Sequence, residues 1–239
     1  TINGGSGIDT IDYTYLGTSK IEVDLSASAG YATVTVVGQE ETDVLRNIEN
    51  VTTASGDDTV YGTSDNNTIK TGAGNDVIKA GAGDDYIDAE GGTDLVDYSN
   101  GTSSITVKLN TTLAQTIGGG LGDDTILNVE NVLGTSYDDT FIGSNSVSNL
   151  FRGGLEGSEI NGDTVDYSEL TGNSNNITAN LSNGTVSIQG FATDTLENIE
   201  NIIGTGGDDT FIGSTNKNTF TGASGNDTVS YSYITTTDT

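Results

Sequence analysis

Apolar residues recur at every ninth position through one long stretch of the chain. From residue 53 to 97 the sequence divides without a gap into TASGDDTVY, GTSDNNTIK, TGAGNDVIK, AGAGDDYID and AEGGTDLVD. Strand-forming residues dominate the last three positions of each unit, and the eighth position is always aliphatic, at Val60, Ile69, Ile78, Ile87 and Val96. A side chain in the middle of so short a strand points to one face, so the eighth positions are expected to form the core.

The first six positions of each unit are rich in Gly, Asp and Asn, which favours a turn. A turn followed by a short strand, repeated many times, coils the chain into a solenoid. If each unit is half a coil, units two apart stack about 4.8 Å from each other on the same side. The pattern therefore predicts an all-β fold: a right-handed parallel β-roll or β-helix solenoid with two rows of turns on opposite edges.

The same frame returns at 4–12 and 204–230, and an isolated match covers 119–127. A looser block at 134–166 keeps the frame only with short insertions near Val147 and at 158–161. Two anchors mark a longer period. One is Asn-Ile/Val-Glu-Asn at 47–50, 128–131 and 198–201, and the other is Asp-Tyr at 12–13, 97–98 and 166–167. The chain resembles a window of about three modules cut from a longer array.

Stretches between the blocks have a different pattern. Residues 20–25, 104–109 and 176–181 alternate apolar and polar positions, which predicts a strand with one buried face. A second strand is expected at 31–37 and at 185–189. These stretches are either β-hairpin excursions or wider coils of the solenoid, and we favour wider coils. Tyr13, Tyr98 and Tyr167 are expected to cover the ends of the thin core.

The resulting organisation has eight segments. Nonapeptide blocks alternate with wider coils or excursions, and the predicted boundaries are 1–12 (end of a block), 13–52 (excursion), 53–97 (five-unit block), 98–133 (excursion), 134–166 (degenerate block), 167–203 (excursion), 204–230 (three-unit block) and 231–239 (start of the next module).

Composition excludes most catalytic chemistry. The 239 residues include no His and no Cys, so an imidazole base, a thiolate nucleophile and the usual zinc, copper or haem ligands are missing. HExxH cannot occur, Gly-x-Ser-x-Gly does not occur, and acid pairs such as Asp57/Asp58 recur as turn residues rather than as a glycosidase dyad. We predict that the chain is not an enzyme.

Charge points to a cation. Asp and Glu number 35 against seven Lys and Arg, a formal charge of −28, while hydrophobic residues are only 32 % of the chain. Such acidity repels nucleic acid, and no apolar stretch is long enough to span a membrane. Carboxylates and backbone carbonyls are the ligands of calcium, so multiple Ca²⁺ ions are the expected cofactor.

The sixth position of the unit supplies the acid, and the glycines let carbonyls approach an ion. The predicted side-chain ligands are Asp9, Asp58, Asp76, Asp85, Asp94, Asp124, Asp139, Asp163, Asp209, Asp227, Asn67 and Glu49. The predicted carbonyl ligands are Gly5, Gly7, Gly56, Gly72, Gly74, Gly81, Gly83, Gly92, Gly207 and Gly225. Three acids that precede the Glu anchors are equally well explained as turn formers: Asp43, Asp124 and Asp194.

Stacked units should share ions between acids 18 residues apart. The predicted pairs are Asp58/Asp76, Asp76/Asp94, Asn67/Asp85, Glu49/Asn67 and Asp209/Asp227. Sites that include Asn67 should be weaker, because an amide carries no charge. Without cations the paired carboxylates repel each other, so folding is expected to require metal.

The nonapeptides resemble the GGxGxDxUx repeats of the RTX (hemolysin-type) calcium-binding proteins. The resemblance covers about half of the chain, and the stretches around the Glu and Tyr anchors also resemble segments of large RTX surface proteins. It implies secretion, usually through a type I channel, and folding on extracellular calcium.

We therefore expect a structural solenoid region of a secreted, cell-surface protein, a surface-layer subunit or an adhesin. Its expected partners are calcium ions and other copies of itself or neighbouring modules. One alternative is a carrier region attached to an enzyme or toxin domain outside this chain. Another is a solenoid that binds carbohydrate or ice, although Val77, Tyr86 and Leu95 interrupt the row of seventh-position threonines that it would need.

Overall fold

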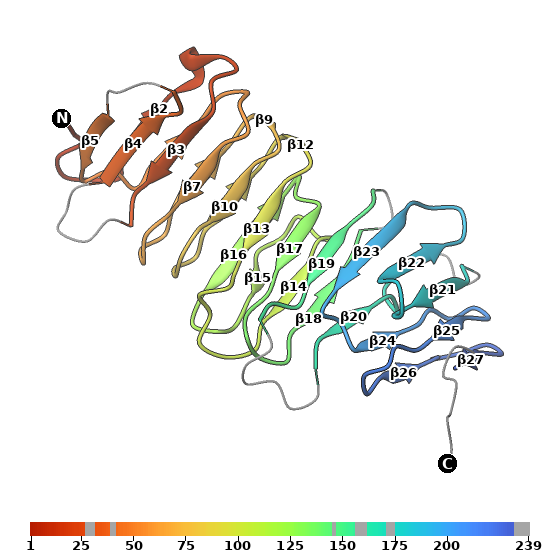
Figure 1. The fold of residues 1–239 in the computed structure, drawn as a ribbon. Helices are drawn as coiled ribbons and strands as arrows, with labels where there is room; N and C mark the ends of the chain where they lie inside the picture. Colours follow the sequence, from red (N-terminus) through yellow and green to blue (C-terminus); the bar gives the residue numbers. More distant parts are fainter. Residues whose placement is uncertain (27–31, 39–41, 145–146, 156–161, 171–174, 232–239) are drawn as a thin grey trace. The chain divides into compact units, whose positions relative to one another are not determined.

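The computed structural model describes residues 1–26, 32–38, 42–144, 147–155, 162–170 and 175–231. The expected strand residue Tyr31, the expected insertion at 158–161 and most of the segment 231–239 lie outside this part of the chain. The fold comprises two compact units, Thr1–Ser103 with Thr111–Leu133, and Ser104–Asn110 with Gly134–Thr239. Each is a coil of short strands (Figure 1).

Two sheets run along the first unit. One has the strand order β1-β5-β4-β3-β7-β10-β13-β17 and the other β15-β16-β11-β8-β6-β2. The first comprises β1 (Ile2–Asn3), β3 (Ile21–Asp24), β4 (Ala32–Val36), β5 (Thr42–Arg46), β7 (Thr59–Tyr61), β10 (Val77–Lys79), β13 (Leu95–Asp97) and β17 (Asn131–Leu133). The second comprises β2 (Thr10–Asp12), β6 (Asn50–Thr52), β8 (Thr68–Lys70), β11 (Tyr86–Asp88), β15 (Gln115–Thr116) and β16 (Asp123–Leu127). A 3₁₀ turn, η1 (Thr14–Leu16), follows β2.

Strand register confirms the predicted half-coil. In the first sheet Val60 is paired with Ile78 and Ile78 with Val96, all in parallel strands. In the second sheet Val51 is paired with Ile69 and Ile69 with Ile87. Each pair is 18 residues apart, so two nonapeptides make one coil. The eighth-position side chains of the block at 53–97 are fully buried between the two sheets, at 0 % exposure.

The second unit repeats this plan. One sheet has the order β19-β23-β22-β21-β25-β27 and the other β14-β18-β20-β24-β26. Their strands are β14 (Thr106–Lys108), β18 (Thr140–Ile142), β19 (Leu150–Arg152), β20 (Thr164–Asp166), β21 (Ile177–Asn180), β22 (Thr185–Ile188), β23 (Thr193–Glu197), β24 (Asn201–Ile203), β25 (Thr210–Ile212), β26 (Thr219–Thr221) and β27 (Thr228–Ser230). Phenylalanines thicken this core, and the rings of Phe141 and Phe151 stack with centroids 5.6 Å apart.

The stretches between blocks correct our preference for wider coils. Strands β3, β4 and β5 form an antiparallel meander, and β21, β22 and β23 form a second one. Both are β-hairpin excursions that lie within the plane of a solenoid sheet, because β3 and β21 each pair in parallel with the next nonapeptide strand. Antiparallel strands can be joined by a tight turn, whereas parallel strands need a longer crossover. The third stretch differs, since β15 pairs antiparallel with β16 while β14 pairs in parallel with β18.

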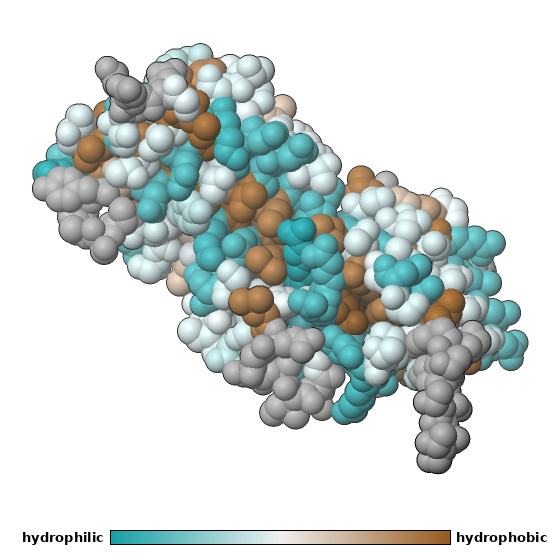
Figure 2. All heavy atoms as spheres, in the orientation of Figure 1, coloured by the Kyte–Doolittle hydropathy of each residue, from teal (hydrophilic) through white to brown (hydrophobic). Residues whose placement is uncertain are grey.

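The surface mixes polar and apolar residues. On the face drawn in Figure 2, hydrophobic residues are interspersed with hydrophilic ones. In the part of the chain that the structure describes, no helix has the length and apolarity needed to cross a membrane.

Truncation of a buried leucine of the first meander should cost more stability than truncation of an exposed leucine outside it. Leu45 in β5 has 0 % exposure and Leu113 has 73 %. Replacing Leu45 by Ala should lower the free energy of unfolding by about 2–5 kcal/mol, because it leaves a cavity. The same change at Leu113 should stay within about 0.5 kcal/mol. Denaturant unfolding in saturating calcium measures both, and equal losses would contradict the packing described here.

Candidate metal centre

Acidic side chains at the sixth position lie inside the turns. Asp58, Asp76, Asp85 and Asp94 are at most 2 % exposed. Each directly precedes a three-residue strand, so the strand register fixes where its carboxylate lies. Successive coils consequently bring acids 18 residues apart next to each other, as the sequence predicts.

These acids form a ladder with the main chain. The backbone N–H of Asp58 donates to Oδ1 of Asp76 at 2.7 Å, and that of Asp76 donates to Oδ1 of Asp94 at 2.8 Å. Asn67 N–H donates to Asp85 Oδ1 at 2.7 Å in the other row. Asp209 and Asp227 are joined in the same way at 2.9 Å in the second unit. The structure thus places these four predicted pairs side by side.

The fifth pair, Glu49 and Asn67, meets through the backbone. The Asn67 amide donates to the carbonyl of Glu49 at 2.6 Å, while the Glu49 carboxylate accepts from Asp9 N–H at 2.9 Å. Glu49 therefore occupies the ladder position of an acid in its coil.

Two further glutamates belong to the ladder, although they are not among the ligands predicted from the sequence. Glu130 accepts from Asp94 N–H and Glu200 from Asp163 N–H, each at 3.0 Å. Both occupy the same place in the long-period anchor as Glu49. The sequence could have indicated both, because the frame that puts Glu49 at the sixth position applies equally to the other two anchors.

The second carboxylate oxygen is the unusual feature. Oδ2 is buried and accepts no hydrogen bond in Asp9, Asp58, Asp76, Asp85 and Asp94. A buried charged oxygen without a partner is costly, and a hard cation is the partner that carboxylates of this kind take. These residues therefore fit calcium by their own geometry.

Burial changes the acidity of these groups. Loss of solvent raises the pKa of Asp76 to about 6 and those of Asp85 and Asp94 to about 7. The neighbouring acids Asp58, Asp124 and Asp76, respectively, contribute a smaller part of these pKa shifts. A bound cation would remove both effects, because it supplies the missing opposite charge.

Main-chain atoms have to complete any such site. Among the described residues, three acidic side chains nowhere gather at one point, so backbone carbonyls must supply the remaining oxygens that calcium needs. Gly74 (φ 139°) illustrates how turns pack closely enough for this, since a Cβ on it would collide with the carbonyl of Gly56 in the preceding coil. The predicted carbonyl donors with positive φ are Gly5, Gly7, Gly72, Gly74, Gly81, Gly83, Gly92 and Gly225, whereas Gly56 and Gly207 do not have it.

Some predicted ligands have both oxygens occupied by the protein. Thr135 N–H and hydroxyl bond to Asp139, and Thr205 bonds to Asp209 in the same way. Asp124 accepts from Asp85 N–H at one oxygen and from the Tyr98 hydroxyl, at 2.6 Å, at the other. Two other predicted ligands do not belong to this group: Asp163 accepts at Oδ1 from Asp139 N–H at 2.7 Å, and Asp227, which accepts at Oδ1 from Asp209 N–H at 2.9 Å, is exposed.

The two sets of long-period anchors meet in space. Besides Tyr98 and Asp124, the Tyr13 hydroxyl donates to Asp43 and the Tyr167 hydroxyl to Asp194, each at 3.0 Å. All three tyrosines are buried, at most 2 % exposed. The sequence predicted their burial, but it did not predict that they bond to the acids before the Glu anchors.

A second polar row lies outside the ladder. Fifth-position side chains accept from the next coil, as where Asn75 N–H donates to Asp57 at 2.8 Å and Thr93 N–H donates to Asn75 at 3.0 Å. Asp57 and Asn75 are exposed. The Asp57 carboxylate is therefore exposed to solvent, unlike the buried carboxylates of the ladder.

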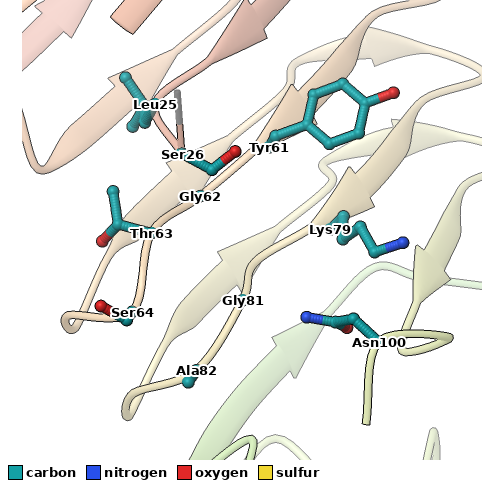
Figure 3. Close-up of a pocket in the computed structure, with 10 residues that line it drawn as sticks. All are labelled: Leu25, Ser26, Tyr61, Gly62, Thr63, Ser64, Lys79, Gly81, Ala82 and Asn100. Atoms are coloured by element: carbon teal, nitrogen blue, oxygen red, sulfur yellow. The ribbon is translucent and has the colours of Figure 1, made fainter. Parts of the chain in front are cut away.

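A groove of about 530 Å³ in the first unit has different chemistry. Figure 3 shows its lining of Leu25, Ser26, Tyr61, Gly62, Thr63, Ser64, Lys79, Gly81, Ala82 and Asn100. None of these is acidic, and the Lys79 amine is bonded to Asp97 and Ser99. The groove is therefore no cation site.

Comparison with known families agrees with this geometry. The model of the RTX calcium-binding nonapeptide repeat matches in four copies, at residues 52–85, 61–96, 71–105 and 195–229. These are the two blocks with the most regular units. A search of curated proteins found no match.

The raised pKa values predict an effect of pH in the absence of calcium. The folded state holds protons more tightly than the unfolded chain, whose Asp pKa is about 3.9. In chelator the destabilisation by Asp76, Asp85 and Asp94 should be complete above pH about 7 and should be relieved as pH falls toward about 4. Far-UV circular dichroism in chelator should show more β-structure at pH 5 than at pH 8.

Two matched triple variants distinguish the effect of these three buried acids from that of a general decrease in negative charge. Asn at the three buried positions should remove the part of this pH dependence that they cause and leave the part due to Asp124 and Asp194, whose pKa burial also raises to about 6. Asn at the exposed positions Asp57, Asp84 and Asp123 should largely preserve the pH dependence. The same response from both variants would contradict the assignment to buried acids.

Proposed function

We propose that this chain, which contains RTX calcium-binding nonapeptide repeats, is a structural region of a secreted cell-surface protein that folds and stiffens when calcium fills its turns. The observation that carries the proposal is the row of buried, unpaired carboxylate oxygens at Asp58, Asp76, Asp85 and Asp94. Each oxygen belongs to a ladder that joins one coil to the next, so one ion would bond two coils together.

Charge supports the same function. Only seven Lys and Arg balance 35 Asp and Glu, so the chain cannot neutralise itself. Extracellular calcium modules have dissociation constants of about 10⁻⁴–10⁻³ M, which lets calcium outside the cell saturate them and leaves them empty in the cytosol. Export as an unfolded chain and folding outside would then follow from one equilibrium.

The architecture favours a structural role over a catalytic one. A solenoid whose coils are cross-linked by ions resists bending, and its length is set by the number of repeats. We propose a surface-layer subunit or an adhesin as the context, with other copies of the chain or neighbouring modules as partners. A carrier region beside an enzyme or toxin domain remains the second candidate, because the same calcium switch would serve secretion there.

Calcium should therefore control folding. Far-UV circular dichroism during a calcium titration should change from largely unfolded in chelator to β-rich at millimolar calcium, and magnesium at the same concentration should not replace calcium, since it prefers a rigid octahedral shell. A chain that is equally β-rich in chelator and in calcium would refute coupled folding.

Replacing Asp76 should reduce calcium binding more than replacing Asp57, which lies in the outer row of fifth-position side chains. Replacing Asp76 by Asn keeps an oxygen for Asp58 N–H but removes the charge shared with Asp58 and Asp94, so ions on both sides should be weakened or lost. The control Asp57→Asn keeps its bond to Asn75 N–H and should bind as many ions as the natural chain. Equilibrium dialysis counts the bound calcium, and equal losses would contradict the ladder.

A further inference from the structure

The turns of the two units fall into two kinds by backbone conformation. In one kind, which we call open, the residues at the second and fourth positions both have positive φ. The open turns with their pairs of positive-φ residues are 4–9 (Gly5, Gly7), 71–76 (Gly72, Gly74), 80–85 (Gly81, Gly83), 89–94 (Glu90, Gly92), 119–124 (Gly120, Gly122) and 222–227 (Ala223, Gly225). In the other kind, which we call closed, neither position has positive φ, and Ser or Thr is second. The closed turns are 62–67, 134–139, 204–209 and 213–218, and Ser144, at the second position of the looser unit that ends at Asn149, also lacks positive φ.

A closed turn bonds to its own sixth-position side chain. The second-position N–H donates to Asn67 at 2.7 Å from Thr63, to Asp139 at 2.6 Å from Thr135 and to Asp209 at 2.7 Å from Thr205. Ser144 and Ser214 do the same to Asn149 and Asn218. In four of these turns the hydroxyl also accepts the N–H of the fourth position, at Asp65, Tyr137, Gly207 and Asn216.

Four of the six open turns leave that oxygen buried and without a partner. Oδ2 is buried and unpaired in Asp9, Asp76, Asp85 and Asp94, all of which lie in open turns. In the open turn 119–124 the Tyr98 hydroxyl takes this place on Asp124. The turn 53–58 is intermediate, because Ala54 lacks both positive φ and a hydroxyl, and its Asp58 Oδ2 is unpaired.

We propose that the second-position residue decides whether a turn takes a calcium ion. A positive-φ residue there withholds the N–H from the sixth-position carboxylate, and calcium completes the oxygen. Ser or Thr there supplies N–H and hydroxyl protons in place of the ion, and these dipoles point their positive ends at the oxygen that a cation would need. This deepens the proposed function, on which it rests, by dividing the predicted sites into those that bind and those that do not.

Specific assignments follow. The ion between the stacked open turns 71–76 and 89–94 should be the tightest of the first unit, since both turns offer an unpaired oxygen and their backbones pair at β9 (Ala73–Gly74) and β12 (Gly91–Gly92). Asp139 and Asp209 should hold no ion of their own, although sequence reasoning treats them as ligands.

Thr205 offers a gain-of-function test with a single substitution. The turn 204–209 already has Gly at the fourth position and Asp at the sixth, and it stacks on the open turn 222–227. Thr205→Gly should open it, so the full chain should bind an additional calcium ion by equilibrium dialysis. The control Thr205→Ser keeps the N–H and hydroxyl and should bind the natural number. An unchanged count for a folded Thr205→Gly would overturn the proposal.

Loss variants test the inference without altering the turn. Asp209→Asn should leave the calcium count of the natural chain unchanged, whereas Asp76→Asn should lower it, with folding of both checked by circular dichroism in saturating calcium. If Asp209→Asn loses an ion, the division into two kinds of turn is wrong while calcium binding stands. If the natural chain takes up no calcium, the proposed function itself is wrong.

Discussion

Most coils of the two units place a carboxylate where water cannot reach it. The strand register sets acids 18 residues apart next to each other, and the backbone N–H of one coil bonds to one oxygen of the next acid, as from Asp58 to Asp76. The other oxygen of the acid is then buried, and turns differ in whether a group of the protein donates a hydrogen bond to it. Packing, metal dependence and the distribution of Thr, Gly and Tyr all follow from this arrangement.

At some turns, hydrogen-bond donors of the protein occupy the carboxylate in place of a cation. At closed turns Thr135 and Thr205 donate to the acid, and at the ends of blocks the buried hydroxyls of Tyr98 and Tyr167 do so. In the folded chain these groups take the place that an ion would otherwise fill. The open turns, in contrast, hold acids whose pKa burial raises to about 6 or 7. Under the proposed division of the turns, calcium sensitivity would be concentrated in the open ones.

Much of the fold was accessible from the sequence, because a nine-residue period fixes which residues face inward. The burial of Ile69, Ile78 and Ile87 and the pairing of Asp76 with Asp94 were both predicted. The excursions were harder. The alternation at 20–25 and 176–181 correctly predicted β3 and β21, but alternation is the same for a strand in a hairpin and one in a wider coil. The antiparallel pairing of β3 with β4 and of β21 with β22 shows that both stretches are hairpins.

The sequence is sufficient to predict the repeat frame, the core positions, the excess of acid and, from these, calcium as the expected ion. These follow from spacing and composition, which need no knowledge of distant contacts. Only the tertiary structure decided which oxygens are left without a partner. Asp94 and Asp139 look alike in sequence, yet Thr135 occupies the second while the first keeps an unpaired oxygen. Tyr98 and Asp124 are 26 residues apart, and only the coiling of the chain brings the hydroxyl to the carboxylate.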